Sequence, residues 1–100
     1  MDFLEKIKEI EMANVKQIKN RVKKIEGFDV LLLNENRRSF RSDKILDFNY
    51  NYKKAASSAT TARQWINRRI PNWVDAAILD GDGNVVHGKT HLGTVRRSYA

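Results

Sequence analysis

The sequence predicts an α+β fold with the element order α-β-β-α-β-β: a small antiparallel sheet, with a long N-terminal helix and a second helix packed on it. Three observations support this prediction. Apolar residues recur at helical spacing over residues 2–26, they alternate with polar residues over 44–52, and turn-forming residues follow the segment 73–79. A chain of 100 residues has the length of one ordinary domain, so residues 1–100 are expected to form a single domain, and no internal repeat is detected.

The first predicted helix spans residues 2–26. Its apolar residues fall on one broad face, and Gly27 follows as the glycine that ends many helices. Asp2 and Glu5 have the spacing of an N-terminal capping box. Polar residues at the edge of the apolar face would suit either a core helix or a helix–helix interface between subunits. The chain is therefore predicted to be a monomer or a homodimer through this helix.

Two strands are predicted between the helices. Val30–Leu33 is apolar at every position and predicts a strand covered on both faces. Residues 44–52 alternate between apolar and polar, which predicts a half-buried strand. The connection between them, residues 34–43, is longer than the two to five residues of most hairpin loops.

The second helix is expected to begin within residues 53–61. Thr61 and Gln64 have the spacing of a capping box, and Pro71 ends the helix. Its apolar stripe includes Trp65, which we assign to the core.

Two further strands, 73–79 and 85–87, are predicted on either side of the glycine-rich turn 80–84. Trp73 is assigned to the core. Residues 90–100 are interpreted either as a last strand over Thr94–Tyr99 or as a loose basic tail.

The chain is strongly basic: 19 Lys and Arg against 12 Asp and Glu give a formal charge of +7. On a small domain such a charge attracts anionic partners. The absence of cysteine excludes disulfides and thiolate chemistry, and fits a reducing compartment. No apolar run approaches the roughly 20 residues of a membrane span. We therefore predict a cytoplasmic protein that does not enter a membrane.

The best candidate for a functional segment is the connection 34–43, which places three arginines around one aromatic residue. Arginine pairs bidentately with phosphate and stacks on bases, and an exposed phenylalanine stacks on unpaired bases. We therefore predict nucleic-acid contacts through Arg37, Arg38, Phe40 and Arg41. In the alternative interpretation the loop is simply solvated and Phe40 folds back onto the core.

Other basic and aromatic residues extend the predicted site. Tyr52 ends an aromatic stripe that would stack bases on an open sheet, although the same stripe also suits a core face. The remaining basic residues of the predicted site occur as adjacent pairs in the sequence. Each pair taken alone is explained as solvated surface, but together the pairs could line a groove. The remaining predicted contacts are Lys53, Lys54, Arg68, Arg69, Arg96 and Arg97.

Metal-binding patterns are incomplete. The turn 80–84 begins like a calcium loop, but Val85 stands where that loop needs glycine and His91 where it needs an acid. His87 and His91 are four residues apart, but Gly88 and the strand context deny them one helical face. No metal and no cofactor are expected.

The leading hypothesis is a non-enzymatic protein that binds nucleic acid, either DNA or RNA. The alternative is a small protein-interaction module, such as an inhibitor or adaptor, that docks on an acidic protein surface. The third hypothesis is a metal-dependent nuclease, suggested by the order of Asp75, Asp80, Asp82 and Lys89. Against it, His87 occupies the position where such a motif needs a carboxylate.

Overall fold

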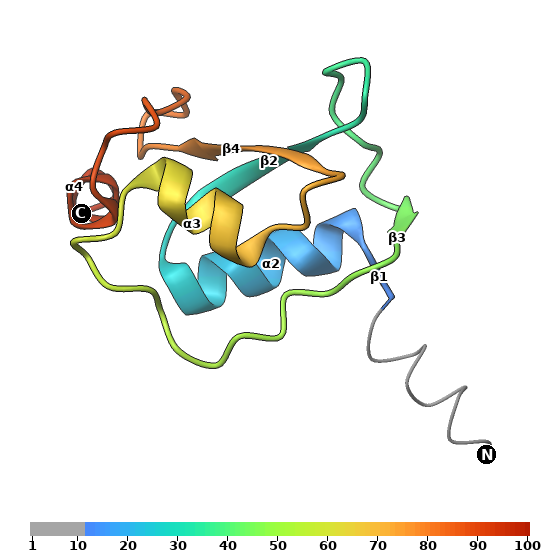
Figure 1. Cartoon of the computed structure of the whole chain (residues 1–100), viewed down its shortest axis with the longest axis horizontal. Helices are drawn as coiled ribbons and strands as arrows, with labels where there is room; N and C mark the ends of the chain where they lie inside the picture. Colours follow the sequence, from blue (N-terminus) through green and yellow to red (C-terminus); the bar gives the residue numbers. More distant parts are fainter. Residues whose placement is uncertain (1–11) are drawn as a thin grey trace.

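The computed structural model describes residues 12–100 and confirms the α+β class (Figure 1). Strands β1 and β3 pair antiparallel, as do β2 and β4. Helix lengths and the number of strands differ from the prediction. The elements in chain order are β1 (Ala13–Asn14), α2 (Val15–Glu26), β2 (Asp29–Leu33), β3 (Ile45–Leu46), α3 (Ala62–Arg69), β4 (Asp75–Leu79) and α4 (Leu92–Arg97).

Helix α2 starts later than predicted because Asn14 is its N-cap. The Asn14 side chain accepts a hydrogen bond from Gln17 N at 2.8 Å, and the Gln17 side chain accepts one from Asn14 N at 3.0 Å. This reciprocal capping box satisfies two backbone N–H groups that the helix itself cannot pair. Gly27 ends the helix in the left-handed conformation, with φ 84°, as predicted. The part of the predicted helix before residue 12, with its proposed capping box, lies outside the described residues.

Helix α3 begins where the sequence predicts. Thr61 is its N-cap, and Thr61 and Gln64 form the expected capping box, with bonds of 3.3 and 3.0 Å. The helix ends at Arg69, because Ile70 adopts the extended conformation that a following proline favours.

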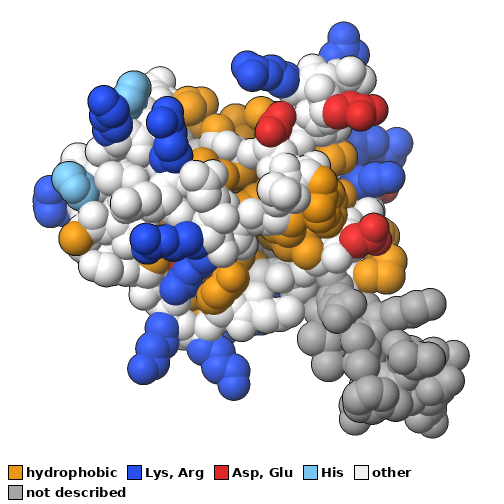
Figure 2. Space-filling view, viewed as in Figure 1, with side chains coloured by type: hydrophobic (Ala, Val, Ile, Leu, Met, Phe, Trp, Pro, Cys, Tyr) orange, Lys and Arg blue, Asp and Glu red, His pale blue; other side chains and the backbone are white. Residues whose placement is uncertain are grey.

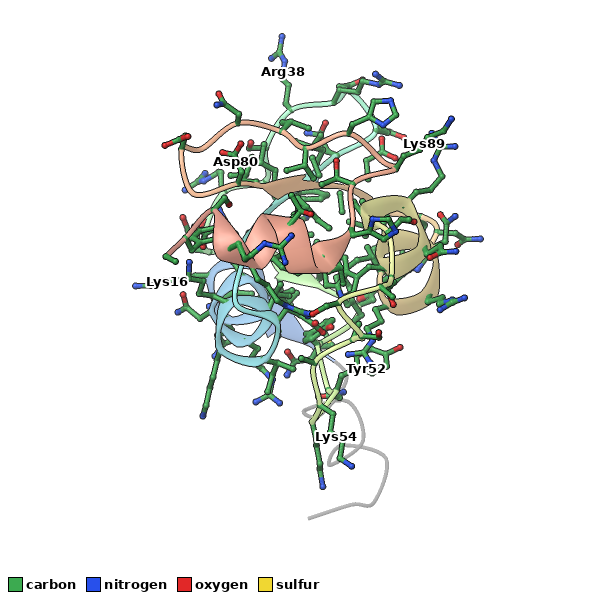
Figure 3. All side chains as sticks on the ribbon, turned by 90° about the vertical axis from the view of Figure 1, so that its left-hand side faces the viewer. Lys16, Arg38, Tyr52, Lys54, Asp80 and Lys89 are labelled. Carbon is green, nitrogen blue, oxygen red and sulfur yellow. The ribbon has the colours of Figure 1, made fainter. Side chains whose placement is uncertain are left out.

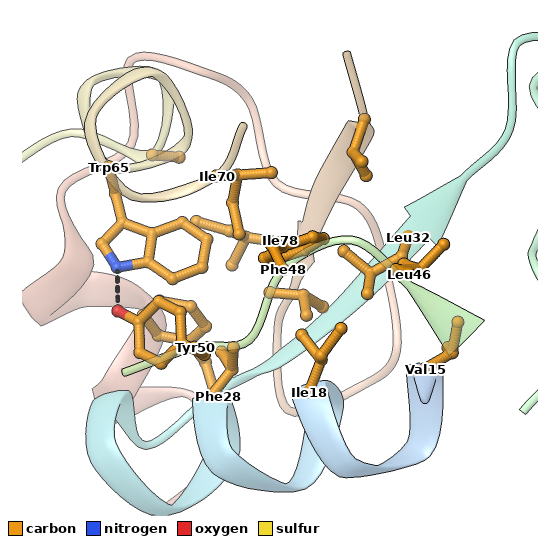
Figure 4. Close-up of a cluster of buried hydrophobic side chains, with 14 of the residues drawn as sticks. Val15, Ile18, Phe28, Leu32, Leu46, Phe48, Tyr50, Trp65, Ile70 and Ile78 are labelled. Carbon is orange, nitrogen blue, oxygen red and sulfur yellow. Dashed lines mark hydrogen bonds between the residues drawn. The ribbon is translucent and has the colours of Figure 1, made fainter. Parts of the chain in front are cut away.

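The core lies between the β2–β4 ladder and the two helices, which pack on the same side of it (Figures 1 and 4). From α2 it takes Val15, Ile18 and Val22, at most 3% exposed, so the apolar side of the described part of this helix is already covered by the chain itself. Trp65 from α3 is fully buried, as predicted. The other buried apolar residues are Ala13, Phe28, Val30, Leu32, Leu46, Phe48, Tyr50, Ala62, Ile70, Val74, Ile78, Leu92 and Val95.

The predicted strand 44–52 is a strand only at Ile45–Leu46. Its alternation nevertheless predicts burial correctly, since Phe48 and Tyr50 are buried while Tyr52 is 41% exposed. Residues 47–52 run extended beneath the core but pair with no strand of the described chain, which is why the strand assignment was wrong there.

The C-terminal region also differs from the prediction. The expected strand 85–87 is reduced to a bridge between Leu79 and Val85. The last residues form helix α4, neither a strand nor a loose tail, because Leu92 and Val95, one helical turn apart, are both buried. Within residues 12–100, no helix is long and apolar enough to span a bilayer.

The structure reveals an internal repeat that the sequence analysis did not detect. Residues 13–46 and 60–92 each contain an N-cap, a helix, a strand, a turn and a return to the start of the helix. In each unit the segment that returns to the start of the helix accepts, through a backbone carbonyl, a hydrogen bond from the backbone N–H of the first helical residue. Val15 N donates to Lys44 O at 2.9 Å, and Ala62 N donates to Thr90 O at 2.8 Å. The two strands β2 and β4 pair around Leu31 and Ala77, so an approximate twofold axis relates the units.

The turns of the two units are equivalent as well. Asn34 and Asp80 each use one side-chain oxygen to accept bonds from the backbone N–H groups two and four residues later. The distances are 2.9 and 3.1 Å in the first turn and 2.9 and 3.0 Å in the second. Arg37 and Gly83, three residues after these side chains, both have positive φ, 59° and 82°.

Candidate nucleic-acid interface

The predicted binding residues lie in separate parts of the structure. Arg37, Arg38 and Arg41 belong to the connection between β2 and β3, whereas Lys53 and Lys54 lie in the segment before α3. In Figure 3, Arg38 points away from the molecule at the top and Lys54 at the bottom. The arginine-rich connection and the lysine pair therefore do not join into one basic patch.

The arginine-rich connection is a closed hairpin turn rather than an open loop. A bridge between Leu33 and Ser39 closes it. Phe40 is partly buried and packs against the core, as in the alternative interpretation given for it above. The three arginines are exposed, and Arg41 Nε lies 3.5 Å from Asp43 Oδ1.

Two of the predicted contacts, Arg69 and Arg96, instead hold a buried carboxylate. Glu26, the last residue of α2, is 1% exposed. Arg69 Nη1 lies 2.8 Å from its Oε2, and Arg96 Nη2 lies 2.8 Å from its Oε1. Arg96 also donates to the backbone oxygens of Glu26 and Ala56, at 2.6 and 2.9 Å. A buried charge needs such partners, so we assign both guanidinium groups to the fold and not to phosphate.

Tyr50 and Trp65 complete this buried cluster. The Tyr50 hydroxyl donates to Glu26 and accepts from Trp65 Nε1 at 3.2 Å (Figure 4). Burial, reinforced by the hydrogen bond to Glu26, raises the pKa of Tyr50 well above its ordinary value of 10.0. Burial lowers the pKa of Arg69, but its bonds and charge interactions with Tyr50 and Glu26 outweigh that effect and raise it overall. Tyr50 therefore stays neutral and Arg69 stays charged across the neutral pH range.

The predicted contact Arg68 lies on α3 beside three polar residues that the sequence analysis did not select. Arg63, Gln64, Asn67 and Arg68 are all exposed and lie on the outer side of the helix. Gln64 uses its Oε1 in the capping box, which leaves its side-chain N–H groups facing solvent. This outer side thus combines two guanidinium groups with two amides.

Two lysine-bearing segments flank the helix. At its start, Arg63 N donates to Gly88 O at 2.9 Å, which brings the exposed Lys89 alongside. At its end, Arg69 Nη1 donates to Lys54 O at 2.7 Å, which fixes the lysine pair there. We call the following seven exposed residues the α3 surface: Lys53, Lys54, Arg63, Gln64, Asn67, Arg68 and Lys89.

The α3 surface contains no carboxylate. The sequence has no Asp or Glu between Asp47 and Asp75, or after Asp82, and the α3 surface comes wholly from these two stretches. Figure 2 views this side of the molecule: lysines and arginines are spread around the visible face, and the acidic side chains lie toward its upper right and right, where basic side chains are present as well. Asp75, which lines a pocket with Asn67, borders this surface, but none of the five cations of the α3 surface forms a salt bridge within the described residues.

Aromatic residues border the α3 surface. Tyr52 is 41% exposed, its ring lies 4.3 Å from the Arg69 guanidinium carbon, and its hydroxyl contacts Arg68 O at 3.3 Å. Trp73 was assigned to the core, but it is 57% exposed, and its ring packs edge-on against Phe48 with ring centroids 5.7 Å apart. A shallow groove of about 290 Å³ lies beside Tyr52 and is lined by Phe48, Asn49, Tyr52, Arg68, Arg69, Ile70 and Pro71.

The remaining candidate, Arg97, is exposed at the end of α4 and donates to Thr94 Oγ1 at 3.2 Å. Among residues 12–100, no three His, Asp or Glu side chains cluster closely enough to hold a metal ion. The Asp80 carboxylate instead holds the backbone of its own turn.

Comparison with known proteins adds no relationship to this geometry. No family model matches the chain, and no curated protein or solved structure is significantly similar to it.

Proposed function

We propose that this protein binds duplex DNA without catalysing a reaction, and that the α3 surface makes the contact. The observation that supports this proposal is the α3 surface itself, whose seven exposed residues are five cations and two amides and include no carboxylate. Lys53 and Lys54 at one end of the helix and Lys89 at the other suit phosphates on the two strands that border a groove. Binding would be driven mainly by the release of counterions from the DNA.

The side chains in the middle of the α3 surface favour a base-reading role. An α-helix fits the major groove of B-form DNA, where arginine pairs with guanine, and asparagine or glutamine with adenine. Arg63, Asn67 and Arg68 have no salt bridge or side-chain hydrogen bond within the described residues. The deep, narrow major groove of duplex RNA does not admit side chains in this way.

The arginine-rich turn is a weaker candidate than the α3 surface. Glu35 and Asp43 lie within the same connection, and Asp43 already pairs with Arg41. We therefore place the contact at α3 and retain Arg37 and Arg38 as a comparison site of similar charge.

The proposal is tested by fluorescence anisotropy with short DNA duplexes over a series of salt concentrations. If the five cations of the α3 surface each neutralise one phosphate, log K falls with log salt at a slope of about −4 to −5. Absence of binding at low salt, or binding that ignores salt, would sink the proposal. Equal affinity for duplex RNA would contradict the major-groove assignment.

The second candidate is a protein-interaction module, and one observation favours it. Trp73 exposes 57% of its surface beside the groove next to α3, and tryptophan is enriched at the centres of protein interfaces. An acidic protein partner would survive nuclease treatment of a lysate, be captured by the wild-type protein and be lost with Trp73→Ala. A partner that disappears with nuclease would instead be held through nucleic acid.

A further inference from the structure

The two helices related by the internal repeat present the same residues to solvent. Counted from the N-caps Asn14 and Thr61, the second, third, sixth and seventh positions match in type. All of these residues are exposed. The matched pairs are Lys16 with Arg63, Gln17 with Gln64, Asn20 with Asn67 and Arg21 with Arg68.

The glutamine pair has a structural explanation, because both glutamines close capping boxes. The basic residue at the second position and the asparagine at the sixth have no such role. Neither Lys16 nor Asn20 has a salt bridge or side-chain hydrogen bond within the described residues. Their recurrence at Arg63 and Asn67 therefore points to a shared use of the two helix surfaces.

The exposed side of α2 is cationic in its own right. We define the α2 surface as Lys16, Gln17, Lys19, Asn20 and Lys24. Between Met12 and Phe28 the one acidic residue is Glu26, which is buried, and the exposed Asp29 just beyond the helix lies 3.7 Å from Lys23, which is therefore left out of this surface.

The α2 surface differs from the α3 surface in two ways. Arg21, the counterpart of Arg68, is held by a bond from its Nε to Tyr50 O at 2.6 Å. The position equivalent to Lys89 is Asp43, an acid. We therefore expect the α2 surface to bind an anion more weakly than the α3 surface does.

The helices that carry the two surfaces lie on opposite sides of the molecule. Both helices pack beneath the β2–β4 ladder, and the twofold axis through Leu31 and Ala77 runs between them. In Figure 3, α2 and α3 lie on the left and right of the molecule, with Lys16 directed outward on the α2 side and Lys89 on the α3 side. A straight duplex held against one helix therefore cannot reach the other.

We infer that the protein holds two DNA duplexes at once, one on the α3 surface and a second, more weakly bound, on the α2 surface. This inference rests on the proposed DNA binding at α3 and adds the second site and the bridging that follows from it. Simultaneous engagement from opposite sides would link separate segments of DNA.

Stoichiometry tests this inference. Short duplexes, each long enough for one contact, are titrated into the protein at low salt, and sedimentation velocity counts the duplexes bound per chain. In parallel, a bead-bound duplex is used to capture a free labelled duplex through the protein. The wild-type protein is expected to bind two duplexes per chain in two steps and to capture the labelled duplex. Capture should fall again when protein is in large excess.

Matched variants assign the two sites. The double variant Lys16→Ala with Lys24→Ala is expected to bind one duplex per chain and to lower capture of the labelled duplex at least tenfold. The double variant Arg63→Ala with Arg68→Ala is expected to lose the tighter of the two binding steps. Arg37→Ala with Arg38→Ala removes the same charge elsewhere and is expected to keep both binding steps.

One duplex per wild-type chain, or unchanged capture by the α2 variant, would overturn the bridging inference while leaving DNA binding at α3 intact. No binding by the wild-type protein would instead overturn the proposed function itself.

Discussion

Leu31 lies opposite Ala77 at the centre of the β2–β4 ladder, and the approximate twofold axis that relates the halves of the chain passes through this pair. On either side of it the pairing repeats, with Val30 opposite Ile78 and Leu32 opposite Ala76. Each half supplies one helix and one strand of this ladder, which is too little to enclose a core alone. The fold is therefore completed by joining the two units, which leaves the outer sides of both helices exposed.

The equivalence of the two turns predicts equivalent losses of stability. Asn34→Ala and Asp80→Ala each remove a side chain that accepts two backbone N–H bonds. Because these turns are solvated, we expect each variant to lower the free energy of unfolding by about 1 kcal/mol. The turns lie at opposite ends of the ladder, so the double variant should show the sum. Urea denaturation measures all three, and a loss at one turn alone would argue against equivalent roles.

Removal of Glu26 should be far more damaging. Glu26→Ala leaves Arg69 and Arg96 partly buried without their carboxylate and removes the acceptor of the Tyr50 hydroxyl. We expect a loss of about 3 kcal/mol in the free energy of unfolding. Glu35→Ala removes an exposed carboxylate and serves as the control, with a change within about 0.5 kcal/mol. Similar urea midpoints for the two variants would contradict a structural role for this cluster.

The raised pKa of Tyr50 predicts a loss of stability in alkali. The unfolded chain releases this proton near pH 10.0 while the folded protein retains it. Stability due to Tyr50 is therefore complete below pH 10 and declines as the pH rises above that value.

Tyr50→Phe isolates this contribution from other groups that titrate in alkali. The variant should be less stable than the wild-type protein by about 1–2 kcal/mol at pH 7, because it loses the hydroxyl bonds to Glu26 and Trp65. The difference in urea midpoint between the two proteins should narrow above pH 10. A constant difference up to pH 11.5 would show that Tyr50 titrates alike in both states.

Local signals in the sequence predict several elements well. The spacing of Thr61 and Gln64 gives the start of α3, and Gly27 gives the end of α2, because capping depends on residues close in the chain. The alternation through Phe48 and Tyr50 predicts burial but not strand pairing. Pairing needs a neighbour that only the folded chain provides.

The candidate site was harder to predict because charge in a sequence does not reveal its partner. Arg69 and Arg96 resemble the other arginines in the sequence, yet a single buried glutamate binds both. The sequence does contain a signal for the burial of Glu26: it follows Val22 by four residues and so falls on the apolar side of α2. A carboxylate in that position needs cationic partners from elsewhere in the chain.

The internal repeat escaped sequence analysis for a related reason. What the units share is mostly geometry, such as the positive φ at Arg37 and Gly83 and the side-chain turns begun by Asn34 and Asp80. Their helices differ in length, with 12 residues in α2 and 8 in α3. The spacing between matched positions is nearly constant, as in Asn14 with Thr61 and Asn34 with Asp80, but few of the matched residues outside the helices are identical.

The salt dependence of DNA binding by two matched variants tests the central claim most directly. Arg63→Ala with Arg68→Ala and Arg37→Ala with Arg38→Ala each remove two exposed positive charges. If the α3 surface contacts phosphate or base edges, the first variant weakens binding at least tenfold and makes the salt slope shallower by up to about 2, whereas the second stays close to the wild-type protein. Equal losses in both variants, or a larger loss in the second, would contradict the assignment of DNA binding to α3.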